Sequence, residues 1–175
     1  GTRLAVYSQI NALVSSGFAN FTWLGLGIHS SAAASDPSLL TAVGAMLNDN
    51  GLGGPFRVNF SGVPVDANDI LVKYTYYGDA DLSGVVDGAD YALIDNGFNV
   101  ILSGWFNGDF DYSSHIDGTD YALIDNAFNS QGGPLAAGGP IPRADLSPLH
   151  FREGKRVRVP GVAGLSTPEL ETSVA

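Results

Sequence analysis

Two twelve-residue segments, 79–90 and 109–120, carry oxygen-bearing groups at the spacing of a calcium-binding loop. Calcium takes six to eight oxygen ligands, and an EF-hand loop supplies them from positions 1, 3, 5, 7, 9 and 12. In the first segment these positions hold Asp79, Asp81, Ser83, Val85, Asp87 and Asp90. In the second segment they hold Asp109, Asp111, Ser113, His115, Asp117 and Asp120. Because position 7 contributes only a backbone carbonyl, Val85 and His115 suit it, and the pattern predicts two Ca²⁺ sites.

Both loops belong to a longer duplicated unit. Residues 78–99 and 108–129 are identical at fifteen of 22 positions, at an offset of 30 residues. One acidic loop alone is a weak signal, because Asp, Ser and Gly are also ordinary turn residues. Two full-length matches, each followed by the same amphipathic segment, favour calcium binding over a solvated acidic turn. We therefore expect folding of residues 76–130 to depend on two calcium ions.

A helix is expected after each loop. Asp87 and Asp117 are suitable N-cap residues, and Asp90 and Asp120 place negative charge in the first turn, where the helix dipole favours it. Apolar residues then recur at helical spacing, namely Tyr91, Ile94 and Phe98 in the first repeat and Tyr121, Ile124 and Phe128 in the second. The predicted fold class of 76–130 is therefore mainly α, with two helices that share a small core.

The two loops differ at position 6, where the chain turns sharply and a positive φ favours glycine. The first loop has Gly84 there, whereas the second has Ser114. A residue with a side chain is strained in the left-handed region. The sequence therefore predicts that loop 109–120 is the weaker metal site.

The two repeats resemble a type I dockerin, on the strength of DADLSGVVDGADYALIDN and DFDYSSHIDGTDYALIDN. The resemblance covers residues 76–130, and the preceding tract is similar to C-terminal regions of large secreted proteins of planctomycete-type bacteria. It implies paired F-hand repeats, calcium-dependent folding, and docking to a cohesin module on proteins that degrade or bind polysaccharides. The helix-start pairs are Gly88-Ala89 and Gly118-Thr119, where familiar dockerins commonly have Ser-Thr-like pairs for cohesin recognition.

Three regions are expected along the chain. Residues 1–75 are predicted to be the C-terminal part of an upstream secreted domain, mixed α/β or irregular. Within them we expect a helix over 4–16 that ends at Gly17, a helix from Asp36-Pro37 to about residue 50, and a strand over 68–78. Residues 76–130 form the dockerin-like module. Residues 131–175 are rich in Gly and Pro at first and are predicted to be a linker and disordered tail.

Composition narrows the function classes. The net charge of −10 disfavours nucleic acid as a partner, because phosphate binding needs clustered Lys and Arg. Residues 1–130 hold fourteen Asp against only Arg3, Arg57 and Lys73. There is no cysteine for a disulfide or a thiolate zinc site, and no apolar run approaches the ~20 residues of a membrane span. We expect a secreted or cell-surface protein whose module is monomeric.

Two alternatives to docking stay open. Calcium could serve a purely structural role at the end of a larger protein, with no partner. Residues 1–75 could instead be the last part of a glycoside hydrolase or adhesin, so the parent protein could be an enzyme. The chain itself is not expected to be one, because His29 and Ser30-Ser31 lack a nucleophile-elbow motif and no catalytic residue is assigned. Trp23 and Trp105 are expected in the core rather than on sugar rings.

Overall fold

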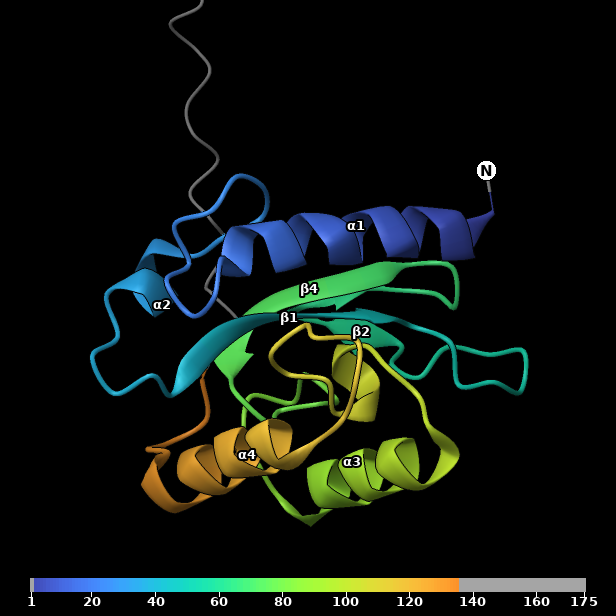
Figure 1. Ribbon diagram of the computed structural model, residues 1–175. Helices are drawn as coiled ribbons and strands as arrows, with labels where there is room; N and C mark the ends of the chain where they lie inside the picture. Colours follow the sequence, from blue (N-terminus) through green and yellow to red (C-terminus); the bar gives the residue numbers. More distant parts are fainter. Residues whose placement is uncertain (1, 136–175) are drawn as a thin grey trace, which may run out of the picture. The chain divides into compact units, whose positions relative to one another are not determined.

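The structure, a computed structural model, describes residues 2–135 (Figure 1). In chain order the elements are α1 (Arg3–Phe18), α2 (Ser31–Ala34), β1 (Thr41–Leu47), β2 (Asn59–Phe60), β3 (Val63–Pro64), β4 (Ile70–Tyr76), α3 (Gly88–Val100), the 3-10 helix η1 (Trp105–Asn107) and α4 (Gly118–Ser130). Strands β1 and β4 pair antiparallel, from Thr41 opposite Tyr76 to Leu47 opposite Ile70, and β2 and β3 form a second small antiparallel sheet. Among these residues no helix is both long and apolar enough to cross a bilayer.

The mainly α fold class is wrong, because the described chain is mixed α/β. Helix α1 lies along one face of the two-stranded β1–β4 sheet, and the two repeats lie on the other face (Figure 1). Six of the seven residues of β1 are buried, as expected for a strand covered on both faces. The helices of the repeats therefore pack within a layered structure that includes a sheet.

The helix predicted from Asp36 to about residue 50 is also wrong, because this segment forms strand β1. Asp36 does cap a turn: its carboxylate accepts hydrogen bonds from the backbone N–H groups of Ser38 and Leu40, both at 3.0 Å, and from the Thr41 hydroxyl at 2.7 Å. The chain then leaves this turn as a strand, because pairing with β4 satisfies its backbone groups. The strand predicted over 68–78 is present as β4.

Helix α1 was expected, but it continues past Gly17 to Phe18. Gly17 is needed for packing rather than for ending the helix, since a Cβ atom there would lie 2.0 Å from the carbonyl oxygen of Ile28. The left-handed residue that ends the helix is Ala19, with φ of 44°.

One hydrophobic core joins residues 1–75 to the repeats. It includes Trp23 and Met46 from the first region, and Trp105, Phe110 and Ile124 from the second. Both tryptophans are buried, as expected from the sequence. The two acidic loops are therefore attached to the β1–β4 layer through the same packing that stabilises it.

Two of the first five residues of the predicted linker, Gln131 and Leu135, form hydrogen bonds with the first loop. The Gln131 side chain accepts a hydrogen bond from the Val86 N–H at 2.8 Å and donates one to the Val86 carbonyl at 2.6 Å. The Leu135 N–H donates to the Gly84 carbonyl at 2.8 Å. The disorder predicted for the rest of the tail concerns residues outside the described part of the chain.

Candidate metal centre

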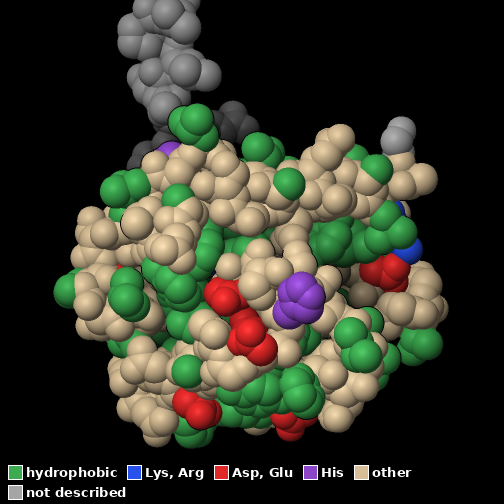
Figure 2. Space-filling view, viewed as in Figure 1, with side chains coloured by type: hydrophobic (Ala, Val, Ile, Leu, Met, Phe, Trp, Pro, Cys, Tyr) green, Lys and Arg blue, Asp and Glu red, His purple; other side chains and the backbone are tan. Residues whose placement is uncertain are grey.

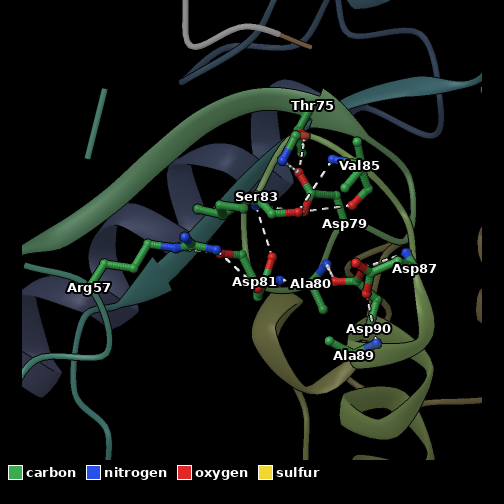
Figure 3. Close-up of polar contacts among 12 residues, drawn as sticks. Arg57, Thr75, Asp79, Ala80, Asp81, Ser83, Val85, Asp87, Ala89 and Asp90 are labelled. Atoms are coloured by element: carbon green, nitrogen blue, oxygen red, sulfur yellow. Dashed lines mark hydrogen bonds and ion pairs between the residues drawn. The ribbon is translucent and has the colours of Figure 1, made fainter. Parts of the chain in front are cut away.

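Three carboxylates converge in each repeat, and each group could hold a metal ion. The first consists of Asp79, Asp81 and Asp90, and the second of Asp109, Asp111 and Asp120. Within each group one oxygen from every carboxylate lies within 4.8 Å of the others. The members come from loop positions 1, 3 and 12, so the chain folds back to bring the end of each loop beside its beginning. Figure 3 shows this arrangement for the first loop.

The start of the following helix positions the last carboxylate of each group. Asp90 accepts hydrogen bonds from the N–H of Ala80 at 2.8 Å and from the N–H of Asp87 at 2.9 Å. Asp120 likewise accepts hydrogen bonds from the N–H of Phe110 at 2.7 Å and from the N–H of Asp117 at 2.9 Å. The bond from the Asp87 or Asp117 N–H is one half of a capping box that fixes the helix start. The bond from the Ala80 or Phe110 N–H holds the carboxylate against the beginning of the loop.

The other predicted ligands lie in and around the two loops. The Ser83 hydroxyl donates to the Val85 carbonyl at 3.1 Å, and the Ser113 hydroxyl donates to the His115 carbonyl at the same distance. Both hydroxyls and both carbonyls are therefore held side by side, as positions 5 and 7 require. The imidazole of His115 is exposed, and its Nδ1 lies 3.2 Å from the Ser113 carbonyl.

Asp87 and Asp117, at position 9, do not join the three-carboxylate groups. Their exposed side chains accept hydrogen bonds from the N–H groups of Ala89 and Thr119, both at 2.7 Å. Each acts as the N-cap that the sequence predicted. A contribution to metal binding from this position would have to pass through water.

The first carboxylates of the two loops have different surroundings. The buried Asp79 accepts hydrogen bonds from the N–H of Ser83 and the N–H of Gly84, both at 2.8 Å, and from the Thr75 hydroxyl. Asp109 is also buried and accepts from the N–H of Gly104 at 3.0 Å. Its Oδ1 has no hydrogen-bond partner in the described part of the chain. A buried anionic oxygen without a donor is costly unless a cation satisfies it.

Burial controls the ionisation of both groups. It raises the pKa of Asp90 to about 7 and that of Asp120 to about 6, and the neighbouring Asp81 and Asp111 carboxylates contribute to these increases. Burial also raises the pKa of Asp79 and Asp109. Without a cation these carboxylates hold protons at a pH where exposed aspartates are ionised.

The metal-free chain is expected to lose stability as pH rises from about 4 to about 7. The folded state binds more protons than the unfolded state between the ordinary aspartate value of 3.8 and the raised values for Asp90 and Asp120, so ionisation favours unfolding there. Denaturant unfolding in chelator across this range measures the effect, and the double variant Asp90→Asn with Asp120→Asn is the control. Stability that rises with pH over this interval would contradict the assignment.

Backbone angles confirm the sharp turn predicted at position 6. Gly84 has φ of 102° and Ser114 has φ of 71°, so both adopt the left-handed region. A Cβ atom on Gly84 would also lie 2.6 Å from the Leu135 carbonyl oxygen and 2.9 Å from Lys73 Nζ. The first loop therefore requires glycine for space as well as for φ, whereas Ser114 is exposed.

Ser114→Gly is expected to tighten metal binding at the second loop by about fivefold, because it removes about 1 kcal/mol of backbone strain. Calorimetric titration of the full chain, in a background where Asp90→Asn disables the first loop, measures this change directly. Gly84→Ser in the Asp120→Asn background is the matched variant, and it should weaken the first loop by more than fivefold. An unchanged constant for Ser114→Gly would show that strain at this turn does not affect binding.

Four residues that contact the first loop or its ligands were not identified from the sequence as parts of the site. Thr75, Lys73 and Arg57 come from the region before the repeats, and Trp105 donates its indole N–H to the Asp79 carbonyl at 2.8 Å. The sequence did offer one indication that Arg57 and Lys73 contact the acidic loops: they are two of only three Lys or Arg residues in 1–130. Their approach to this loop depends on tertiary packing.

Comparison of the chain with protein-family models, with curated proteins and with solved structures gives no significant match. The function is therefore inferred from the geometry of the two acidic groups and not from similarity to known proteins.

Proposed function

We propose that residues 76–130 bind two calcium ions, one in each loop, and present helices α3 and α4 to a protein receptor. The observation that carries this proposal is the duplicated convergence of three carboxylates with adjacent hydroxyl and carbonyl oxygens. The dockerin resemblance suggests a cohesin-like receptor and a secreted or cell-surface parent protein that acts on or binds polysaccharides.

The donor set supports calcium over softer metals. Each loop offers carboxylate, hydroxyl and carbonyl oxygens, which suit a hard cation, and the chain has no cysteine. The unpartnered Oδ1 of Asp109 is the kind of atom that a cation would satisfy. When bound, calcium would neutralise the clustered carboxylates and join the two ends of each loop.

The exposed faces of the two helices support docking. Ala92, Asp95 and Asn96 on α3 are exposed, as are the equivalent residues on α4, Ala122, Asp125 and Asn126. Figure 2 shows hydrophobic side chains flanked by acidic ones over these helices. Both faces are exposed, and on α4 Ala122 and Asn126 line a pocket together with Phe21 and Leu39 of the preceding region.

Reciprocal contacts make the helix pair nearly symmetric. The Tyr91 hydroxyl donates to Asp125 at 2.5 Å, and the Tyr121 hydroxyl donates to Asp95 at 2.7 Å. The Tyr91 ring packs edge-on against Phe128, and the Phe98 ring packs likewise against Tyr121. A receptor that binds one helix face would meet almost the same face after a half-turn, so docking in two orientations is possible.

Single charge substitutions on this surface are expected to have small effects. Asn96→Arg or Asn126→Arg alone should weaken receptor binding by about twofold, because one of two equivalent orientations remains. The double variant should abolish binding. Binding to immobilised cohesin modules and capture from the native secretome, each with and without chelator, measure this. Complete loss from one substitution would show a single asymmetric site.

The shared core favours a second candidate function, in which calcium only stiffens this end of a larger protein. Trp105 contacts the first loop through Asp79 and packs on Phe110 of the second loop, so the loops also stabilise the layer before them. Capture of no partner, in calcium or in chelator, would favour this structural role. The gene sequence upstream would show whether the parent is a hydrolase.

A further inference from the structure

Two positive side chains from outside the repeats contact the first calcium loop. The Arg57 guanidinium pairs with Asp81 Oδ2 at 2.9 Å and donates to the Asp81 backbone carbonyl at 2.7 and 2.9 Å (Figure 3). Lys73, on β4, is only 9% exposed and donates from Nζ to the Leu82 carbonyl at 3.1 Å. The same Nζ lies 2.9 Å from the place that a Cβ atom on Gly84 would occupy, between the ligand positions Ser83 and Val85. Both cations therefore act on ligands of the first loop.

Arg57 is held firmly in this position. The buried Asn48 side chain accepts a hydrogen bond from the Arg57 N–H and donates one to the Arg57 carbonyl, both at 2.8 Å. Asn48 also donates to the Asp66 carbonyl at 2.8 Å. The backbone that carries the guanidinium is thus held by hydrogen bonds to a buried residue that directly follows β1.

The carboxylates of the second loop have no comparable contact with positive side chains in the described part of the chain. Within residues 2–135 no Lys or Arg forms an ion pair with Asp109, Asp111 or Asp120. Asp109 Oδ1 lacks a donor, whereas the equivalent Oδ1 of Asp79 accepts from the Ser83 N–H at 2.8 Å and from its hydroxyl at 3.2 Å. The protein therefore supplies more hydrogen bonds and more positive charge to the carboxylates of the first loop than to those of the second.

We propose that loop 109–120 is the tighter calcium site and fills first, while Arg57 and Lys73 make loop 79–90 a weaker site that fills at higher calcium concentration. This inference rests on the proposed calcium-binding function. A positive charge beside a site repels a divalent cation, and about tenfold in the dissociation constant is a modest estimate for one charge. Two charges outweigh the roughly fivefold cost of the strained Ser114, so the order is opposite to the one the sequence predicts.

Calorimetric calcium titrations of full-chain variants test this order. Asp90→Asn leaves only the second loop functional, and Asp120→Asn leaves only the first. We expect Asp90→Asn to bind calcium at least about tenfold more tightly than Asp120→Asn. Adding Arg57→Gln should tighten the first loop by about tenfold in the Asp120→Asn background and leave the second loop unchanged in the Asp90→Asn background. Far-UV circular dichroism checks that each variant is folded.

Two further variants separate charge from structure. Arg57→Lys keeps the positive charge and should leave the first loop weak, and Lys73→Gln repeats the comparison should Arg57→Gln fail to fold. Raising the salt concentration should reduce the difference between the calcium dissociation constants of the two loops, because salt screens the charges of Arg57 and Lys73. Tighter binding by the first loop, or an equal effect of Arg57→Gln on both loops, would overturn the inference and leave calcium binding intact. Failure of the unmodified chain to bind calcium would overturn the proposed function together with it.

Discussion

Removal of calcium with a chelator is expected to lower the free energy of unfolding by about 2.7 kcal/mol for each site that was occupied at a hundred times its dissociation constant. The physical reason is the crowding of three carboxylates within 4.8 Å in each loop. Without a cation they repel one another or take up protons. With two sites filled the expected loss is about 5 kcal/mol, a large part of the stability of an ordinary domain.

Denaturant unfolding measures this loss of stability. The fluorescence of the buried Trp23 and Trp105 and the helix content report the transition. The double variant Asp90→Asn with Asp120→Asn is the matched control and should not respond to calcium. Equal concentrations of magnesium should stabilise less, because magnesium requires a stricter octahedral geometry than these loops offer. Identical unfolding midpoints in calcium and in chelator would show that the acidic groups do not bind the ion.

Trp105→Ala is expected to destabilise the chain by about 3–5 kcal/mol, the usual cost of removing a large buried aromatic ring. Trp105 is fully buried, and its ring centroid lies 5.1 Å from Phe110 and 5.8 Å from Tyr112. It also packs against β1, where a Cβ atom on Gly44 would lie 2.4 Å from the indole nitrogen. The substitution therefore removes a contact shared by both loops and the sheet.

Two control variants show which part of Trp105 matters. Trp105→Phe keeps an aromatic ring but leaves the Asp79 carbonyl without its indole donor, which should cost about 1–3 kcal/mol. Phe106→Ala changes the next residue, which is only half-buried and packs on Phe56, and it should cost less than Trp105→Ala. Equal losses for Trp105→Ala and Phe106→Ala would show that the indole does not connect the loops and the sheet.

The sequence by itself determined the local features of the repeats. The caps at Asp87 and Asp117, the convergence of positions 1, 3 and 12, and the left-handed turn at Ser114 all depend on residues within one loop and the first turn of its helix. Such interactions span few residues, so their spacing can be read directly. The calcium ions, the receptor and the dockerin resemblance stay predictions that the experiments above address.

Only the tertiary structure decided the fold class and the unequal charge around the two loops. The segment after Asp36 has a good helix start, yet it becomes β1, because hydrogen bonds to β4 and burial on both faces outweigh local preference. Arg57 and Lys73 reach the first loop only because the β1–β4 layer packs beneath the repeats. The duplicated sequence makes the six ligand positions of the two loops nearly equivalent, but the residues that surround the loops are not duplicated. The charge around each loop therefore depends on contacts between residues far apart in the chain.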